Sequence, residues 1–516
     1  MEQLSLFDIK PDISNWQVSK FSADDFSTQD ARLDLEKRFI NLTEISDSFN
    51  RQSVSFQLSK KDQLHRWLKY KEGFSSELVL NLLKDFKIPK GGLVMDPFLG
   101  SGTTAMVCQM NGINSVGFDI LPMSKIAIEA KKNVFCYSIP ELMEVQKELN
   151  SMNCPPDYQK SFDYLSITDG AFPESTAKEV SFFSEWNASS DYSKLAKNLI
   201  VLCILNSLET ISYTAKDGQY LRWDYRSKKM REANEDRLSK GKNPIVVRLD
   251  KGDLPSLKET LCKEFDNVLK DIEYIQKYSS STEANIIFKE GSALFEMPKM
   301  DNEILDGVIT SPPYCNRYDY TRTYALELNY LNLSKENITK LRQTLLSCTV
   351  ENKSKLAELE KFYSEIGRKS FYEHTVNIIN QNDSLNEIKS ALQERNLKGD
   401  INNNGVLRMV DGYFTELTFI YAELYRLCKK GARVAFVNDN VRYAGEVIPV
   451  DFISTELAKQ IGFKPVKIVT LRQQKGNSSL INLEIMLKSN KQIAQNKYYN
   501  NCNSHYLYGI KIHFFV

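Results

Sequence analysis

The amino-acid sequence predicts an α/β protein with a doubly wound parallel sheet and two largely helical inserts. Strand-like runs alternate with helical patterns around residues 93–132, 286–335 and 415–488, which is typical of a parallel sheet with helical crossovers. Residues 133–285 read as helix-rich, and residues 336–405 are rich in Lys, Glu, Asn and Leu. At 516 residues the chain is long for one domain, so we expect a core with about one or two further modules.

The first block opens with an apolar strand, Leu93–Asp96, followed by a Gly-Ser-Gly turn and a helix-compatible segment, Ala105–Met110. Gly100 and Gly102 let the backbone approach a ligand closely, and the N-terminus of the next helix offers free N–H groups. The next strand ends in Asp119, seventeen positions after Gly102. Taken alone, the glycine turn could be a purely structural turn, and Asp119 could be a helix cap. The two features together favour a site that binds the ribose of a nucleoside cofactor.

The second informative segment is an apolar run from Asp306 that ends in Ser311, Pro312, Pro313 and Tyr314. Two consecutive prolines donate no backbone N–H and fix φ, so they cannot continue a central strand. The chain must therefore leave the sheet in a rigid turn that places a serine and a tyrosine beside it. Such an acceptor-rich turn suits a flat ring with an amine, such as a nucleobase.

With these two motifs the chain resembles the amino-directed DNA methyltransferases that use S-adenosylmethionine. The segment Asp96–Thr104 is similar to their cofactor-binding motif, and Thr310–Tyr314 is similar to their catalytic motif. Residues Lys71–Ser75, followed by a Leu-rich helix from Leu78 to Phe86, resemble the segment that lines the methionine end of the cofactor. The resemblance implies a Rossmann-like methyltransferase sheet with a C-terminal antiparallel hairpin.

The resemblance also implies a role for individual residues. The residues it assigns to S-adenosyl-L-methionine are Lys71, Phe74, Asp96, Phe98, Gly100, Ser101, Gly102, Thr103 and Asp119, and those it assigns to catalysis are Ser311, Pro312, Pro313 and Tyr314. A serine before the two prolines usually accompanies methylation of cytosine N4, whereas Asp or Asn accompanies adenine N6. One departure is Ser292, in Glu290–Ala293, which stands where the family usually has an acid.

The expected mechanism follows from the weak nucleophilicity of the cytosine amine. Hydrogen bonds from the amine to Ser311 and to the Pro312 carbonyl would aim the nitrogen lone pair at the methyl group, and orientation would drive the transfer. Tyr314 would stack on the base once it is rotated out of the duplex. Cys315 adjoins the motif but lacks the Pro-Cys context of a nucleophile, so a packed side chain is favoured there.

Two segments are expected to contact DNA. Residues 316–322 interleave basic, aromatic and acidic side chains. This pattern is typical either of a loop that clamps the flipped nucleotide or of a solvated helix start. Residues 218–229 mix rings and cations, which favours DNA contact over a charged helical face with Trp223 buried beneath it; the basic stretch continues through Arg231, Arg237, Lys240 and Lys242. The residues predicted to bind DNA are Arg222, Trp223, Tyr225, Arg226, Arg317 and Arg322.

Near the C-terminus, Tyr421–Gly431 predicts a helix closed by glycine, and a strand follows at Arg433–Val437. Residues 463–471 and 480–487 are strand-like and predict the hairpin that completes the sheet. In the first insert, Leu195–Leu208 predicts a buried helix. The predicted organisation is an N-terminal extension (1–60), a cofactor-binding half (61–132), an inserted target-recognition region (133–285), a catalytic segment (286–335), a helical insert (336–405), the remainder of the core (406–490) and a C-terminal tail (491–516).

Composition limits the remaining function classes. The formal charge is +1, so binding to double-stranded DNA must rest on a local basic face. Nine cysteines without a C-x-x-C pair and four histidines predict neither a metal site nor a disulfide framework. No long apolar run or signal pattern is present, which predicts a bacterial cytoplasmic protein without a membrane partner.

Three functions remain open: a cytosine-N4 DNA methyltransferase with a cognate restriction endonuclease, an adenine-N6 or RNA methyltransferase with the same core, and a non-catalytic nucleic-acid binder. At the N-terminus, Gln3–Phe7 resembles the peptide by which bacterial proteins dock onto the sliding clamp. The alternative there is an amphipathic start that packs on the core.

Overall fold

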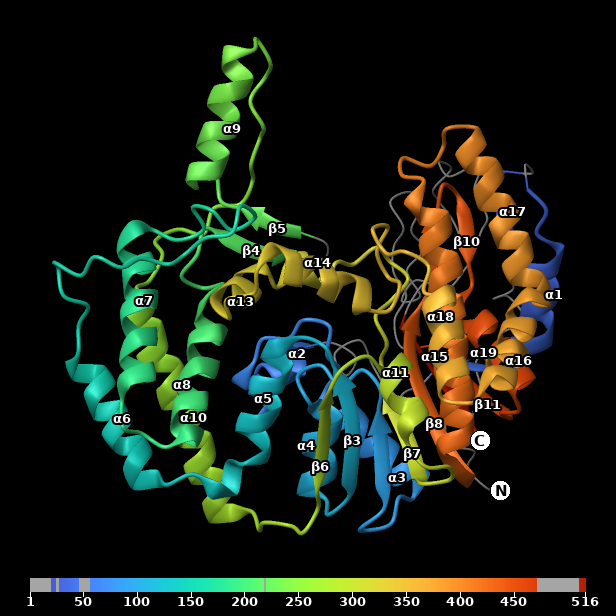
Figure 1. Ribbon diagram of the computed structural model, residues 1–516, viewed down its shortest axis with the longest axis horizontal. Helices are drawn as coiled ribbons and strands as arrows, with labels where there is room; N and C mark the ends of the chain where they lie inside the picture. Colours follow the sequence, from blue (N-terminus) through green and yellow to red (C-terminus); the bar gives the residue numbers. More distant parts are fainter. Residues whose placement is uncertain (1–19, 25–26, 46–55, 218–219, 471–509) are drawn as a thin grey trace, which may run out of the picture.

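The computed structural model describes residues 20–24, 27–45, 56–217, 220–470 and 510–516, and Gln3–Phe7 therefore lies outside the described residues. Within them a central sheet has the strand order β1-β11-β12-β8-β7-β2-β3-β6 (Figure 1). Its strands are β1 (Thr43–Ile45), β2 (Leu93–Asp96), β3 (Asn114–Asp119), β6 (Ile286–Glu290), β7 (Leu305–Thr310), β8 (Cys428–Asp439), β11 (Pro465–Thr470) and β12 (Ile510–Phe515).

The strands β6, β3, β2, β7 and β8 run parallel to one another, which confirms the predicted doubly wound sheet. β12 is antiparallel to both of its neighbours, β8 and β11. The predicted antiparallel pair is thus present, but its second strand is Ile510–Phe515, in the segment expected to be a C-terminal tail. Residues 480–487, expected to form that strand, lie outside the described residues.

Alternating side chains of the strands build two separate cores, because successive residues of a strand point to opposite faces of the sheet. Met95, Val308 and Phe436 pack on the side of α18 and α19, whereas Val94, Ile309 and Ala435 pack on the side of α3 and α4. The helices and 3-10 helices of the core are α1 (Asp30–Phe39), η2 (Ile40–Leu42), α2 (Phe56–Ser59), η3 (His65–Trp67), α3 (Ser76–Phe86), α4 (Thr103–Met110), α5 (Pro122–Lys132), α11 (Ala293–Glu296), η5 (Met297–Lys299), α18 (Gly405–Leu427) and α19 (Val450–Ile461).

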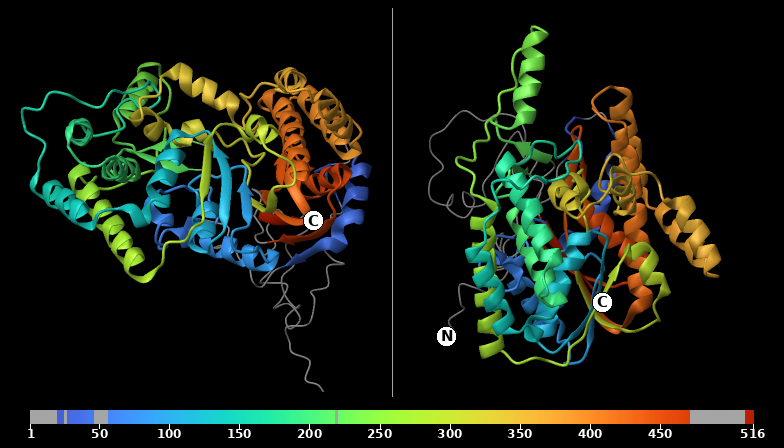
Figure 2. Two further views of the ribbon diagram at one scale, coloured as in Figure 1. Left: turned by 60° about the horizontal axis from the view of Figure 1, so that its bottom comes forward. Right: turned by 60° about the vertical axis from the view of Figure 1, so that its left-hand side comes forward.

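The first insert lies beyond the β6 edge of the sheet and is helical, as predicted (Figure 1). Its elements are η4 (Val134–Cys136), α6 (Ile139–Ser151), α7 (Glu174–Ser189), α8 (Lys194–Ser207), the hairpin strands β4 (Thr214–Asp217) and β5 (Tyr220–Trp223), α9 (Lys228–Ser239) and α10 (Leu257–Tyr278). The predicted buried helix at Leu195–Leu208 is confirmed by α8. In both Figure 1 and the right view of Figure 2, α9 projects away from the body of the protein.

The second insert continues from the segment after the Ser311–Tyr314 turn, and its later helices, α15 to α17, pack near α18 at the other end of the sheet (Figure 1). The elements after the turn are α12 (Tyr320–Thr323), α13 (Ala325–Tyr330), α14 (Lys335–Thr344), α15 (Leu356–Glu365), α16 (Lys369–Asn380) and α17 (Asp383–Leu397), and a small hairpin follows β8, formed by β9 (Val441–Tyr443) and β10 (Glu446–Ile448). No helix in the described part of the chain is long and apolar enough to cross a membrane.

The predicted end of the helix before β8 is wrong by four residues. α18 ends at Leu427, and Gly431 lies inside β8 with φ +84°. The register between β7 and β8 shifts at this place, because Leu305 pairs with Cys428 whereas Gly307 pairs with Arg433. A residue in the left-handed region at a register shift is a bulge, which explains why glycine occupies the position without capping the helix.

Candidate functional site

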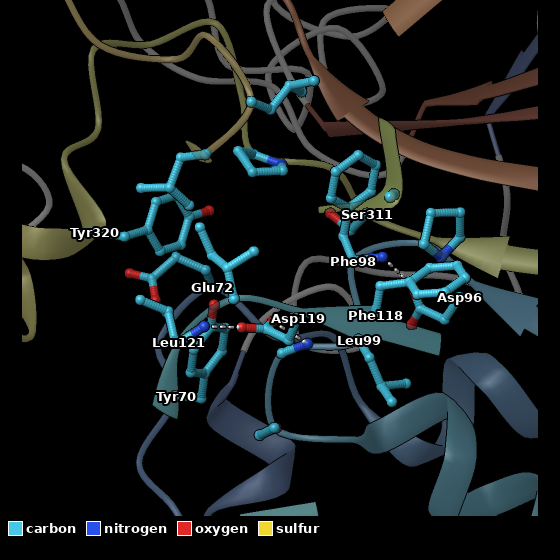
Figure 3. Close-up of a pocket in the computed structure, with 18 of the residues that line it drawn as sticks. Tyr70, Glu72, Asp96, Phe98, Leu99, Phe118, Asp119, Leu121, Ser311 and Tyr320 are labelled. Atoms are coloured by element: carbon cyan, nitrogen blue, oxygen red, sulfur yellow. Dashed lines mark hydrogen bonds between the residues drawn. The ribbon is translucent and has the colours of Figure 1, made fainter. Parts of the chain in front are cut away.

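A cleft opens where β2, β3 and β7 end, the edge at which ligands bind in parallel α/β sheets. It spans about 750 Å³, part of which is open to solvent, and is lined by both sequence motifs, which lie some two hundred residues apart (Figure 3). From the predicted cofactor set the lining contains Phe74, Asp96, Phe98, Gly100, Ser101, Thr103 and Asp119, and from the predicted catalytic set it contains Ser311 and Pro313.

The glycine turn lies tightly against its surroundings. Gly100 and Gly102 have φ values of +55° and +87°, and Gly102 precedes the first residue of α4. A Cβ atom on Gly100 would lie 3.0 Å from the ring of Tyr70. Glycine is therefore required at this position by both the backbone conformation and the nearby ring.

Asp119, at the end of β3, bonds to two loops at the floor of the cleft. Its carboxylate accepts the backbone N–H of Gly100 at 2.9 Å and that of Leu121 at 2.7 Å (Figure 3). Burial raises the pKa of this carboxyl to about 6, although the hydrogen bonds oppose the shift. The same side chain thus fixes the glycine turn and presents carboxylate acceptors to the cleft.

Asp96 connects the two motifs from the end of β2. Its Oδ1 accepts the hydroxyl of Thr310 at 2.6 Å and the N–H of Phe98 at 3.1 Å, and its Oδ2 accepts the hydroxyl of Thr104 at 2.7 Å. Burial raises its pKa to about 6. Because these bonds tie β2 to β7 and α4, Asp96 positions the Ser311–Tyr314 turn beside the glycine turn.

The Ser311–Tyr314 turn directs its serine into the cleft and its tyrosine partly away from it. The Ser311 hydroxyl donates to the Tyr314 hydroxyl at 3.1 Å, and the Tyr314 ring packs against the core on the α3 side of the sheet. Pro312 is buried behind the turn. Cys315 is fully buried, and burial raises its thiol pKa well above the usual value, which confirms the prediction of a packed side chain.

One wall of the cleft was predicted only in part from the sequence. Tyr70, Glu72 and Tyr320 form it, and Leu345 and Leu346 add an apolar surface from the segment after α14. Burial raises the pKa of Glu72, and hydrogen bonds from the hydroxyls of Tyr318 and Tyr324 oppose the shift. Glu72 and Tyr320 lie in the segments 71–75 and 316–322 that were expected near the site, whereas no motif pointed to Tyr70, Leu345 or Leu346.

Lys71 does not belong to the cleft lining, whereas the next residue, Glu72, does. The Lys71 ammonium group bonds to the carbonyl of Lys216 and to the carboxylate of Glu209, at 3.3 Å for the latter. Both partners belong to the first insert. Lys71 and Glu72 lie in a turn, in which Glu72 reaches the cleft and Lys71 reaches the insert.

Ser292, which stands where the resemblance expects an acid, lines the cleft together with Gly291 and Ala293. Its hydroxyl therefore lies where an acid side chain would lie. Within the described residues no group of three or more His, Cys, Asp or Glu side chains is placed to hold a metal ion.

Comparisons with known proteins agree with this geometry. A family model described as DNA methylase, of the N6/N4 type, matches residues 15–129, which include the glycine turn and Asp119. The type II methyltransferase M.BsoBI of Geobacillus stearothermophilus is 52% identical over 465 residues, covering 90% of this chain and 91% of that protein. This chain belongs to the type II DNA methyltransferase family. M.AvaI of a Nostoc species is 37% identical over 451 residues, covering 86% of this chain and 88% of the relative.

In this type II DNA methyltransferase, the residues predicted to bind DNA in the first insert lie on and after a hairpin. Arg222 and Trp223 lie on β5, and Tyr225 follows with 51% of its surface exposed. The alternative of a charged helical face over a buried Trp223 is wrong, because β5 is a strand and Trp223 is only partly buried. The ammonium group of Lys229 lies 4.7 Å from the centre of its ring.

Arg226 is held by protein groups at the root of the projecting arm. Its guanidinium donates to the Asp224 carboxylate at 2.9 and 2.8 Å and to the carbonyl of Gly252 at 2.6 Å. These bonds lower the pKa of Asp224 to about 2. The basic stretch beyond it forms α9, in which no residue is buried.

In the segment 316–322 of the methyltransferase, the helix start of one interpretation is present but is not solvated. Asp319 is the N-cap of α12, and Tyr318, Asp319 and Tyr320 are all buried. Arg322 is partly exposed and bonds to Glu351 at 2.7 Å. Arg317 is also partly exposed and has φ +66°. The two arginines therefore lie at the surface beside the cleft wall.

Proposed function

We propose that this chain is a site-specific DNA methyltransferase that transfers a methyl group from S-adenosyl-L-methionine to the exocyclic N4 of cytosine in duplex DNA. The observation that carries the proposal is the opening of the Ser311 turn into the same cleft as the glycine turn and Asp119. Membership of the type II family supports DNA as the substrate. The serine before the two prolines supports cytosine as the base.

The donor set of the cleft fits the proposed cofactor. The Asp119 carboxylate offers acceptors for ribose hydroxyls, and the first turn of α4 offers backbone N–H groups for the methionine carboxylate. Phe74, Phe98 and Phe118 offer apolar surface to the rest of the molecule. When bound, S-adenosylmethionine supplies a methyl group activated by its sulfonium.

The residues of the catalytic turn orient the target amine. The Ser311 hydroxyl already donates to Tyr314, so its oxygen lone pairs remain to accept a hydrogen bond from the amine. The Pro312 carbonyl would accept the second amine hydrogen, and this pair of bonds favours a pyramidal nitrogen with a directed lone pair. Rigid prolines keep both acceptors in place, so orientation supplies the main catalytic gain.

The proposed DNA contacts come from the first insert and from the rim of the cleft. Arg222, Trp223 and Tyr225 would meet the duplex, and Arg226 would keep the hairpin root in place. Arg317 and Arg322 would bind phosphates next to the flipped base. Tyr314 would stack on that base after turning from the position it has without DNA.

We further propose a bacterial cytoplasmic setting and a cognate restriction endonuclease, because the relatives are type II methyltransferases. Docking of Gln3–Phe7 onto the sliding clamp is a separate proposal. A pull-down with Leu6 and Phe7 changed to Ala tests it, and undiminished clamp binding by the variant would remove it.

The decisive experiment incubates the protein with labelled S-adenosylmethionine and unmodified DNA, with RNA as a parallel substrate, followed by nucleoside mass spectrometry. The expected product is N4-methylcytosine in DNA. N6-methyladenine as the sole product would show that the target base is adenine and not cytosine. Label found only in RNA would show that the substrate is RNA and not DNA. No transfer to any nucleic acid would favour a non-catalytic binder.

Two substitutions separate cofactor binding from transfer. Asp119→Ala removes the ribose acceptor and is expected to weaken cofactor affinity about 10- to 100-fold. Tyr314→Ala removes a stacking ring and is expected to lower the transfer rate about 10- to 100-fold with little change in cofactor affinity. Calorimetry and single-turnover kinetics measure the two effects, with Asp119→Asn and Tyr314→Phe as matched controls. Equal loss of cofactor affinity in both Ala variants would contradict this division.

A further inference from the structure

A buried lysine of the first insert reaches into the wall of the cleft. Lys216 lies on β4, and its side chain is only 4% exposed. Its ammonium group pairs with the carboxylate of Glu327 on α13, which is 1% exposed, and lies 4.5 Å from the centre of the Tyr324 ring. A cation from the insert therefore lies between two groups of the segment that follows the catalytic turn.

Tyr324 connects Lys216 to the glycine turn through Tyr70. Its ring stacks on that of Tyr70, with centres 5.3 Å apart and an angle of 8° between the planes. Its hydroxyl donates to Glu72 at 2.5 Å. Tyr70 and Glu72 both line the cleft, and the Tyr70 ring is the group that a Cβ on Gly100 would meet at 3.0 Å. The contacts from Lys216 to the glycine turn are thus continuous.

The backbone of Lys216 is fixed to the same region. Its N–H donates to Glu209 at 2.8 Å, and its carbonyl accepts the ammonium group of Lys71. On its other side β4 pairs with β5, where Lys216 is opposite Leu221 and Ala215 is opposite Arg222. A shift of the hairpin that carries Arg222 must therefore move Lys216 or break these bonds.

An ion pair can couple the position of the hairpin to that of the cleft wall, because the energy of the pair depends steeply on geometry. Burying two charges costs free energy that only a close, well-oriented pair offsets, so a displaced Lys216 would leave Glu327 in an unfavourable state. An apolar contact of the same size would tolerate a small shift. The position of the hairpin is therefore coupled to the position of the Tyr324–Tyr70 stack.

We propose that Lys216 is a positioning residue through which the seating of the β4–β5 hairpin on DNA sets the affinity of the cleft for the cofactor. The inference rests on the proposed function, since it takes β5 to meet DNA. Linkage requires the coupling to be reciprocal, so bound cofactor strengthens DNA binding by the same factor.

The test measures the affinity of the full chain for S-adenosylhomocysteine by calorimetry, alone and with an unmodified plasmid that the wild-type protein methylates. For the wild type we expect DNA to tighten binding by about fivefold or more, in the range typical of coupled sites. For Lys216→Met we expect a factor near one. Lys216→Arg keeps the charge and is expected to retain most of the coupling.

A folding defect is separated from lost coupling by a compensated variant, Lys216→Met with Glu327→Leu, which leaves no unpaired buried charge. It is expected to bind S-adenosylhomocysteine and to unfold like the wild type, yet to show no tightening by DNA. Wild-type coupling in either Met variant, or its absence in the wild type, would overturn the inference. Failure of the proposed function would show differently, as no methylated nucleoside from the wild-type protein.

Discussion

The projecting arm of the first insert and the inner side of the second insert place their charged side chains in opposite ways. In the first insert, α9 buries no residue and projects from the body, and the aromatic ring of Tyr225 next to it is half exposed (Figure 1). In the second insert, Lys355 bonds to Glu416 at 2.8 Å and Arg395 bonds to Glu446 at 2.8 Å, and all four side chains are 5% exposed or less.

The Lys355–Glu416 pair supports the cleft from behind. Glu416 also accepts the N–H of Ser347 at 2.9 Å, and Ser347 directly follows Leu345 and Leu346 in the cleft lining. The second insert is therefore packed as an extension of the core, whereas the arm of the first insert carries cations toward solvent. This difference teaches that two helical inserts of one chain can be distinguished by where they place their charged side chains.

The largest expected effect tests the structural role of the second insert. Arg395→Met removes a cation that bonds to Glu446 and Asp24, and leaves the fully buried Glu446 with fewer partners. We expect the free energy of unfolding to fall by about 3 kcal/mol. The control is Lys361→Met, which removes an exposed pair with Glu365 and should cost less than about 0.5 kcal/mol. Denaturant unfolding measures both, and equal effects would break the comparison.

A pH effect is expected at the root of the first insert. The ammonium group of Lys251 donates to the carbonyls of Ser212 at 2.7 Å and Thr214 at 2.8 Å, and burial lowers its pKa to about 8. Between that value and about 10.4 the unfolded chain binds a proton that the folded chain lacks, so the free energy of unfolding rises with pH by up to about 1.4 kcal/mol per unit.

Lys251→Met should remove this rise, and the difference between variant and wild type isolates it from other titrating groups. Urea unfolding at several pH values between 8 and 10.4 provides the measurement. A wild-type slope that survives in Lys251→Met would show that another group is responsible. In the second insert, the ammonium group of Lys355 pairs with the Glu416 carboxylate, whereas that of Lys251 donates to backbone carbonyls. The two lysines therefore differ in the charge of the groups that hold them.

The smallest expected effect tests the projecting arm. The N–H of Tyr225 donates to Leu249 at 3.2 Å and that of Lys251 donates to Asp224 at 2.8 Å, so the two ends of the arm already lie together. Replacing residues 228–247 by a short glycine-serine linker should leave unfolding nearly unchanged. We expect DNA affinity to fall about tenfold, with a shallower salt dependence. Unchanged affinity in a filter-binding assay would assign DNA binding elsewhere.

The sequence was most informative where neighbouring residues decide the structure. The strand at Leu93, the glycine turn, α4 and the acid at Asp119 are contiguous, and each is determined by local backbone preference and the alternation of apolar residues. The rigid turn at Pro312 and Pro313 is equally local. These features predicted the sheet, the edge at which the cleft opens and the part of its lining that the two motifs supply.

What could not be predicted depends on contacts between distant segments. Nothing local distinguishes Lys71 from Glu72 as the residue that reaches the cleft, because the choice is made by Glu209 and Tyr324 far along the chain. Leu345 and Leu346 join the lining only through packing of the second insert. Gly431 looks like a helix end until the register of β7 and β8 is known.

The position of β12 has a consequence for the order in which the protein can fold during synthesis. β12 fills the place between β8 and β11, with six residue pairs to β8 and five to β11. Until residues 510–515 have left the ribosome, neither neighbour can complete its hydrogen bonds. The strands β2 and β3 with their glycine turn need no such delay. The part of the sheet around β2 and β3 is therefore expected to form first on the ribosome, and the sheet to close only after residues 510–515 have emerged.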